Sequence, residues 1–294
     1  MRFRELRSAL AAFAALLAAV PAAAGAADLR EAILASEPVA VVADPARSAD
    51  LAVERVRDGD EVAVTLRNRS ATPVAVREVV LFDLAHGLPA TTPYYGEGLQ
   101  MLAQYGGTLA EHVDYGEYPD RSHYRLPEPE GFRRVYSLLT LEPPGAPQLM
   151  LAFASCRRFV GAFDLSPTRV RGTIDCEGLE IAPGAAIELE PLVVRAGPDR
   201  ASLLADLARR LARAHPRTAY PAPPAGWCSW YCFGPKVTAK DVLDNLAAME
   251  RDHPDLKFVQ IDDGYQPTMG DWLDTGPGFG GKPVQEILRE IKSR

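Results

Sequence analysis

The chain has 294 residues and is 47% hydrophobic and 24% charged, proportions typical of a globular protein, which excludes a disordered or fibrous one. Its formal net charge is −7, whereas attraction to nucleic acid or to anionic lipid requires a positive surface. We therefore expect neither nucleic acid nor a membrane surface as a partner, and the length allows one large domain or two ordinary ones.

Residues 1–27 have the pattern of a secretory signal peptide. A basic start with three arginines precedes an apolar run that ends at Pro21, and the small residues up to Ala27 suit a cleavage site. A membrane anchor is the alternative interpretation, but the run is shorter than the about 20 apolar residues that a spanning helix needs. We expect the leader to be removed and the mature protein to be periplasmic or secreted, without a membrane-spanning segment.

Residues 28–196 have the pattern of an antiparallel β-sandwich. Apolar residues alternate with polar or small ones, as in Val62, Val64 and Leu66, and turn sequences such as Asp58-Gly59 and Pro183-Gly184 interrupt the runs. Many short strands with almost no helical periodicity predict sheets that each bury one face. The motif Asn68-Arg-Ser70 also matches a glycosylation acceptor, which matters only in a host that glycosylates.

Six of the ten tyrosines lie between Tyr94 and Tyr124, interleaved with glycines. Such a segment can form a sugar-stacking surface, because an aromatic face is apolar while the phenol bonds outward, but ordinary packing or a domain interface is the simpler interpretation. His112 and His123 lie in the same stretch, and as isolated histidines they are better explained as surface or packed residues than as ligands.

Four cysteines are present, and in an oxidising compartment they allow three pairings, which stay open: Cys156, Cys176, Cys228 and Cys232. The last two are spaced like half of a metal site, but no second pair of Cys or His residues stands nearby in the sequence. We therefore expect packed or paired thiols and no metal.

Residues 197–225 are predicted to connect two domains. Leu204, Leu207 and Leu211 recur at helical spacing over 199–215, and a proline-rich stretch follows them.

From Gly226 to Arg294 the pattern is strand, helix, strand, helix. Residues 226–230 and 258–261 are short apolar strands, and Thr238 with Asp241 can cap the helix between them. Val242, Leu246 and Met249 line one side of that helix, and Val284, Ile287, Leu288 and Ile291 form a stripe on the second helix. These are two parallel βα units, whereas a closed barrel of eight needs about 250 residues. We therefore interpret residues 226–294 as the start of an incomplete (β/α)8 barrel.

Two acidic residues, Asp262 and Asp263, directly follow the second strand. The carboxyl end of a parallel strand is where α/β sheets and barrels place ligands, and sugar hydroxyls are donors that satisfy paired carboxylates. Trp227 in the preceding strand and Trp272 in the following loop can supply apolar faces for a pyranose. The alternatives are a solvated Asp-Asp-Gly turn and a weak divalent-metal site.

Three motifs carry a resemblance to a known family: Gly226-Trp-Cys-Ser-Trp230, Phe258-Val-Gln-Ile-Asp-Asp-Gly-Tyr265 and Gly270-Asp-Trp272. In order and spacing they resemble the start of the catalytic barrel of α-galactosidases of glycoside hydrolase family 36. Tyr95–Thr108 also resembles a segment of that family's amino-terminal β-sandwich. The resemblance implies a retaining hydrolase that removes terminal α-linked galactose from oligosaccharides, without a metal or organic cofactor.

The same resemblance assigns roles to individual residues. It implies that Asp262 and Asp263 bind galactose hydroxyls and that Trp227 and Trp272 wall the sugar pocket. It places the nucleophile in a Lys-x-Asp motif on a later strand, and no lysine of this chain has Asp two residues on. The catalytic carboxylates are therefore expected beyond Arg294, and the chain alone is expected to be inactive.

Two departures from the family pattern leave the substrate open. Cys228 stands where Asn is usual, and Tyr265 stands where Trp is common, so hydrolysis or transfer, and galactose or its N-acetyl form, are not decided. A raffinose-synthase-like transglycosylase shares these early motifs. A non-catalytic secreted carbohydrate-binding protein is the alternative from a different class. Relatives often form homo-oligomers, but no interface is identifiable in the sequence.

Overall fold

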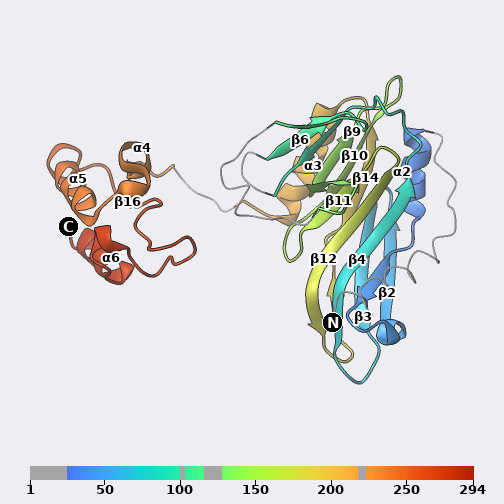
Figure 1. Ribbon diagram of the computed structural model, residues 1–294, viewed down its shortest axis with the longest axis horizontal. Helices are drawn as coiled ribbons and strands as arrows, with labels where there is room; N and C mark the ends of the chain where they lie inside the picture. The colour runs from blue at the N-terminus through green and yellow to red at the C-terminus, as the bar shows by residue number, and fades with distance from the viewer. Residues whose placement is uncertain (1–24, 100–102, 116–127, 218–222) are drawn as a thin grey trace. The chain divides into compact units, whose positions relative to one another are not determined.

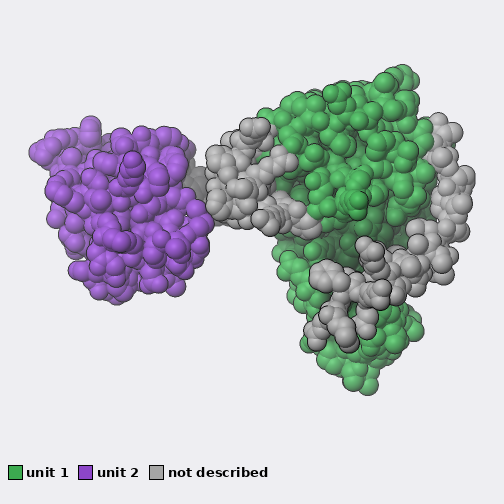
Figure 2. Space-filling model, in the orientation of Figure 1, with its two compact units in different colours: residues 1–217 green, residues 218–294 purple. Residues whose placement is uncertain are grey.

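The computed structural model describes residues 25–99, 103–115, 128–217 and 223–294. The chain divides into two compact units, residues 1–217 and 218–294, which Figure 2 shows in separate colours. Within the described ranges, no helix is long and apolar enough to cross a membrane. Most of the predicted leader lies outside the described residues, and secretion therefore stays a prediction.

Unit 1 contains a five-stranded antiparallel sheet in the order β1-β4-β12-β11-β8 (Figure 1). Its strands are β1 (Val39–Val42), β4 (Val74–Ala85), β8 (Arg133–Tyr136), β11 (Gly161–Leu165) and β12 (Arg169–Ile181). The long pair β4 and β12 forms its centre, with register shifts at Gly172/Thr173 and Asp175/Leu179. Such irregularities bend a strand and increase its twist.

A nine-stranded antiparallel sheet forms the rest of the unit, in the order β13-β3-β14-β10-β9-β5-β6-β7 with β2 paired to β3. Its strands are β2 (Leu51–Asp58), β3 (Glu61–Asn68), β5 (Tyr94–Glu97), β6 (Gln104–Gly107), β7 (His112–Asp114), β9 (Leu138–Leu141), β10 (Gln148–Phe153), β13 (Ala186–Glu188) and β14 (Leu192–Gly197). Val62, Val64 and Leu66 are all buried on β3, as their alternation predicts. The predicted antiparallel β structure is confirmed.

The two sheets share one buried core. Phe163 on β11 is fully buried and stacks on Phe153 of β10, in the other sheet, with ring centroids 5.2 Å apart. Its other neighbour is Phe82 of β4, at 6.4 Å. Burying a phenylalanine removes its whole side chain from water and contributes about 1.5–3 kcal/mol. Aromatic contacts across the core thus hold the sheets together.

Helix α2 (Ala26–Ala35) is not among the elements that the sequence predicts. It buries Leu29, Ile33 and Leu34 in the same core, and the guanidinium of Arg30 donates to the carbonyl of Val194 at 3.1 Å. The apolar stripe directly follows an alanine-rich segment, so the pattern merges with the end of the leader. Ala26, inside the predicted leader, is buried as well.

Helix α3 (Arg200–Ala214) confirms the helix predicted near residues 199–215. Asp199 caps it by accepting a hydrogen bond from the backbone N–H of Ser202 at 2.7 Å. Leu203 and Leu207 pack on residues of β10 and β14, so the helix belongs to unit 1. The structure differs here from the predicted 197–225 connection, because the leucine stripe is buried against the sheet.

Unit 2 has the predicted alternation of strands and helices. The strands β15 (Gly226–Cys228) and β16 (Phe258–Gln260) are parallel, and α5 (Ala239–Asp252) connects them. The remaining elements are α4 (Trp230–Phe233), η3 (Gly234–Lys236), η4 (Pro277–Phe279) and α6 (Val284–Lys292), and in unit 1 η1 (Pro45–Asp50). Thr238 and Asp241 form the predicted capping box of α5. On α6 the predicted stripe is only partly buried, since Leu288 is 42% exposed.

Two side features of the sequence analysis have clear outcomes. Asn68 is fully buried, and its amide donates to the carbonyls of Thr72 and Ile181 at 2.8 Å each, so the match to a glycosylation motif does not mark an accessible acceptor. All four cysteines are free thiols in this structure. His123 lies outside the described residues.

The described part of the tyrosine-rich segment is mostly packed. The hydroxyl of Tyr94 hydrogen-bonds Nδ1 of His112 at 2.8 Å, and burial raises the pKa of this tyrosine well above its usual value. His112 is thus a packed residue, as expected. Tyr115 is 63% exposed, but its ring lies over Gly106.

Candidate functional site

The candidate site lies at the carboxyl ends of β15 and β16. Trp227 pairs with Val259 and Cys228 with Gln260 in the parallel register. Successive side chains of a strand point to opposite faces, so Trp227 and Val259 share one face and Cys228 and Gln260 share the other. Trp227 and Val259 belong to the apolar cluster formed with the helices. Cys228 and Gln260 therefore lie on the face of the sheet opposite to the helices.

Asp262 continues the face that carries Cys228 and Gln260. Its Oδ2 accepts a hydrogen bond from Nε2 of Gln260 at 2.8 Å and a longer one from Sγ of Cys228 at 3.7 Å. Its backbone N–H donates to Oγ of Ser229 at 2.9 Å, and Ser229 is fully buried. The backbone N–H of Ser229 in turn donates to the carbonyl of Gln260 at 3.1 Å, which extends the contact between the two strand ends.

Asp263 lies in a tight turn beside Asp262. Its backbone N–H donates to Oδ1 of Asp262 at 2.9 Å, and its own Oδ1 receives only a 3.3 Å contact from Nε2 of Gln266. The next residue, Gly264, has a φ of +112°, and a Cβ there would lie 2.6 Å from the backbone of Pro235. Because only glycine tolerates this conformation and this close approach, the turn that presents Asp263 is tightly constrained.

The predicted tryptophans lie apart from the carboxylates. Trp227 is half-buried and packs against Phe233, with ring centroids 6.2 Å apart, on the helix side of the sheet. Trp272 is 47% exposed in the loop after β16, where its carbonyl accepts a hydrogen bond from the hydroxyl of Tyr265 at 3.0 Å. The structure thus brings Asp262 and Asp263 together, but it does not bring Trp227 to their face of the sheet.

Three polar residues at this site are not among the residues that the sequence predicts: Ser229, Gln260 and Gln266. The alternation of Val259 and Ile261 with Gln260 and Asp262 carries a signal for one of them, since it places Gln260 and Asp262 on one face. Ser229 and Gln266 become site residues only through strand pairing and the turn, which a single sequence does not display.

The site contains acceptors but no arrangement for breaking a glycosidic bond. A retaining mechanism needs two carboxyl groups about 5–5.5 Å apart on either side of the bond, whereas Asp262 and Asp263 are chain neighbours at one strand end. Within the described residues there is no group of three or more His, Cys, Asp or Glu side chains that could hold a metal ion. The chemistry available to these residues is the binding of hydroxyl groups.

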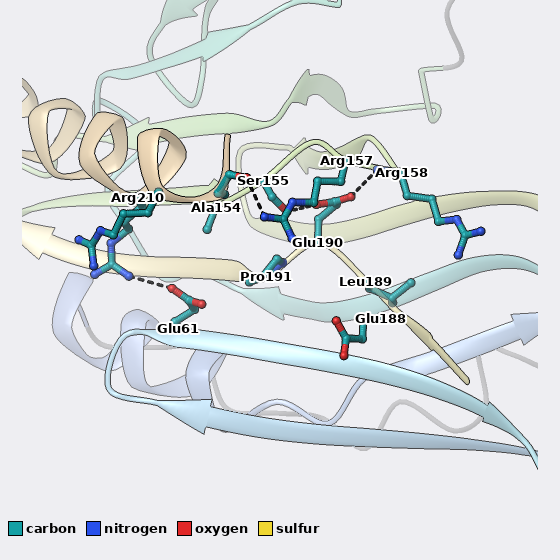
Figure 3. A pocket seen from close by; sticks show the side chains of 12 residues that line it. Glu61, Ala154, Ser155, Arg157, Arg158, Glu188, Leu189, Glu190, Pro191 and Arg210 are labelled. Carbon is teal, nitrogen blue, oxygen red and sulfur yellow. Dashed lines mark hydrogen bonds and ion pairs between the residues drawn. The ribbon is translucent and has the colours of Figure 1, made fainter. Parts of the chain in front are cut away.

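Unit 1 contains a separate hollow of about 430 Å³ between the end of α3 and the loops beside β10 and β14 (Figure 3). The carboxylate of Glu190 is buried there and accepts hydrogen bonds from the hydroxyl of Ser155 and from the backbone N–H of Arg158, the latter at 2.8 Å. Arg210 pairs with Glu61 at 2.9 Å. These contacts join α3 and the loop after β10 to the sheet, so we assign the hollow a structural role.

Comparison with known proteins identifies one sequence relative and several similar structures. No protein-family model matches the chain. A stretch of 41 residues, 14% of the chain, is 49% identical to a probable galactinol–sucrose galactosyltransferase of Arabidopsis thaliana and spans 5% of that protein.

The similar structures are α-galactosidases. The galactosidase domain of an α-galactosidase–sucrose kinase, AgaSK, is 13% identical, with a TM-score of 0.49, and 86% of this chain aligns with 38% of it. An α-galactosidase from Lactobacillus brevis is 11% identical, with a TM-score of 0.41, over 88% of this chain and 40% of its own. The GH36 α-galactosidase AgaA from Geobacillus stearothermophilus, in complex with stachyose, is 10% identical, with a TM-score of 0.38, over 87% and 42%.

The chain therefore spans less than half the length of each of these proteins. The names of the matched proteins agree with the resemblance that the motifs of residues 226–272 carry. The chain resembles, over part of their length, α-galactosidases and a galactosyltransferase, and this predicted resemblance is confirmed.

Proposed function

We propose that this chain is the amino-terminal portion of an exported glycoside hydrolase of the α-galactosidase type. In this proposal unit 1 is the β-sandwich domain, and unit 2 supplies the first two βα units of a (β/α)8 barrel. The longer protein removes terminal α-linked galactose from oligosaccharides by a retaining mechanism. Its nucleophile and acid/base lie beyond Arg294, and it needs no metal or organic cofactor.

One observation carries this proposal: two adjacent carboxylates lie at the carboxyl end of a parallel strand, at the edge where barrels bind their ligands. Asp262 lies on the face of the sheet opposite to the helices, and in a barrel the helices are outside, so that face is the interior. Trp272, exposed in the loop after β16, remains the proposed apolar wall for the sugar. Trp227 keeps a place in this proposal only if its indole edge reaches the strand ends.

The test is the activity of a protein that extends beyond Arg294. We expect the longer reading frame to encode a Lys-x-Asp motif on a later strand and its product to hydrolyse a chromogenic α-galactoside. Purified residues 1–294 should show no turnover, and turnover by that chain would contradict the assignment of the catalytic carboxylates. A reading frame that stops at Arg294 would instead favour a carbohydrate-binding protein without catalysis.

A galactosyl transferase is the second candidate, and the 49% identity to a probable galactosyltransferase over 41 residues favours it. Hydrolase and transferase differ in whether water or a sugar hydroxyl accepts the galactosyl group. Incubating the longer protein with galactinol and sucrose separates them, because a transferase forms a trisaccharide and a hydrolase releases free galactose.

Export and assembly complete the proposal. Removal of residues 1–27 predicts a mature chain beginning near Asp28, which mass spectrometry of the protein from the periplasm or medium can check. A homo-oligomer is also proposed, and light scattering of the longer protein tests it.

A further inference from the structure

We infer that the two neighbouring aspartates have separate roles: Asp263 receives the hydroxyls of the ligand, whereas Asp262 is a positioning residue held by Gln260 and Cys228. The inference rests on the proposed function, because it concerns how the same site binds its sugar. It differs from the resemblance, which implies that both carboxylates bind galactose directly.

The carboxylate of Asp262 is already occupied. Oδ2 accepts from Nε2 of Gln260 at 2.8 Å and from Sγ of Cys228 at 3.7 Å, and Oδ1 accepts from the backbone N–H of Asp263 at 2.9 Å. A ligand hydroxyl that bonded to Asp262 would have to share or replace one of these donors. Replacing a donor leaves it without its partner, which costs free energy that the new bond only partly returns.

The contacts of Asp262 also hold the backbone of the site. Its own N–H is fixed by the buried hydroxyl of Ser229 at 2.9 Å, and its carboxylate fixes the next N–H along the chain. Asp262 therefore connects the end of β15 to the turn that presents Asp263. This is the geometry of a residue that acts through its neighbour.

Asp263 has the complementary set of contacts. Oδ1 has a single long contact with Gln266, at 3.3 Å, and Oδ2 accepts from no donor in the described part of the chain. Gln266 is itself anchored, since its Oε1 accepts from the backbone N–H of Gly264 at 3.0 Å. Asp263 is half-buried on a constrained turn, so its carboxylate is oriented in advance and retains accepting capacity. A hydroxyl donated to an ionised carboxylate forms one of the stronger hydrogen bonds available in water.

Affinity for galactose in the longer protein tests the ligand half of the inference. We expect D263N to weaken galactose binding roughly ten- to a hundredfold, the range for losing a hydrogen bond to a charged group. We expect less than about a threefold change for D262N, because the asparagine side chain keeps an oxygen for the N–H of Asp263 and Gln260 can turn its carbonyl to the new amide. Combining Q260A with D262N should add nothing to D262N alone, since Gln260 acts through Asp262.

Equal losses in D262N and D263N would overturn the division of roles, as would losses that add in the double variant. The positioning half has its own test in residues 1–294, which needs no activity. Amide exchange at residue 263 should speed up about tenfold in D262A, which removes the acceptor, and stay unchanged in D262N and D263A. An unchanged rate in D262A would refute the positioning role.

The two tests also separate this inference from the proposed function. A longer protein that neither binds galactose nor turns over an α-galactoside would overturn the proposed function and the ligand role of Asp263 together. The exchange rates would still decide whether Asp262 positions its neighbour.

Discussion

The two compact units differ in how completely they bury their apolar residues. In unit 1 the largest core side chains, such as Phe163, Leu139 and Leu149, are fully buried between two sheets. In unit 2 the buried core is small, while Phe258 is 49% exposed and Leu288 42% exposed. These two residues line an open groove of about 660 Å³ beside β16.

The difference follows from sheet type. Antiparallel sheets close their core by packing face to face, whereas parallel strands are found almost only where neighbours cover both faces. Unit 2 has two parallel strands of three residues each, with its helices on one side. We therefore expect unit 1 to carry most of the stability of the chain and unit 2 to unfold at a lower denaturant concentration.

The chain supplies a probe for each unit. Its three tryptophans, Trp227, Trp230 and Trp272, all lie in unit 2. Selective tryptophan fluorescence therefore reports the unfolding of unit 2. Far-UV circular dichroism of the β signal reports mainly unit 1, so the two transitions can be followed in one sample.

The largest effect should come from the variant F163A. Removing a ring that stacks on Phe153 and approaches Phe82 creates a cavity between the sheets, so we expect unit 1 to lose about 3–5 kcal/mol in its free energy of unfolding. Urea titration followed by circular dichroism measures this loss, and the fluorescence transition should not move. F163L is the matched control, with an expected loss below about 1.5 kcal/mol. A shift of both transitions by the same amount would show that the units unfold together.

A second large effect is expected at Asn68. Its amide donates to Thr72 and Ile181, and its Oδ1 accepts from the backbone N–H and the hydroxyl of Ser70 at 2.9 and 2.8 Å. N68A leaves these buried partners unsatisfied and should cost unit 1 about 2–3 kcal/mol, measured by the same titration. In N68D the acceptor contacts survive, so its loss should be smaller. Wild-type protein from a glycosylating host should carry no glycan at Asn68, and a glycan there would contradict the burial.

The sequence predicts those features that depend on neighbours along the chain. The alternation on β3, the turn at Asp58-Gly59 and the capping box at Thr238 are all local, and all are confirmed. The position of Asp262 and Asp263 after a parallel strand is predictable for the same reason. These features follow from side-chain periodicity and backbone hydrogen bonding within a few residues.

The features that depend on tertiary packing are not predictable in this way. Helix α2 has an apolar stripe, but only the core of unit 1 distinguishes it from the end of a leader. Asn68 matches a surface motif, yet the strand ends around it enclose its amide. The side on which Trp227 lies follows from its pairing with Val259, and the sequence does not contain that register. Pairing between distant segments decides each of these cases.

A smaller effect in unit 1 is a dependence of stability on pH. His86 is fully buried, its Nε2 lies 3.1 Å from the carbonyl of Ser166, and its Nδ1 accepts from the N–H of Leu88. Burial lowers the pKa of His86 below the ordinary histidine value of 6.5. The unfolded chain therefore binds a proton that the folded chain excludes, and stability falls as the pH drops below about 6.5, by at most about 1.4 kcal/mol per pH unit.

The variant H86Q should remove most of this slope. Denaturant titrations at several pH values between about 5 and 7 measure it, with circular dichroism as the signal for unit 1. Burial also lowers the pKa of His112, which accounts for a residual slope in the variant. An unchanged slope in H86Q would exclude His86 as its source.

The smallest predicted effects are the most selective, because each unit has one helix that a side-chain N-cap begins in the described ranges. Asp199 caps α3 in unit 1, and Thr238 caps α5 in unit 2 by accepting from the N–H of Asp241 at 3.2 Å. Removing either cap should cost about 1 kcal/mol. D199A should therefore shift only the circular dichroism transition, and T238A only the fluorescence transition. Since α5 carries much of the small core of unit 2, T238A should abolish a larger fraction of that unit's stability than D199A abolishes in unit 1. If T238A left the fluorescence midpoint unchanged, α5 would have to be held mainly by contacts other than its own cap and core.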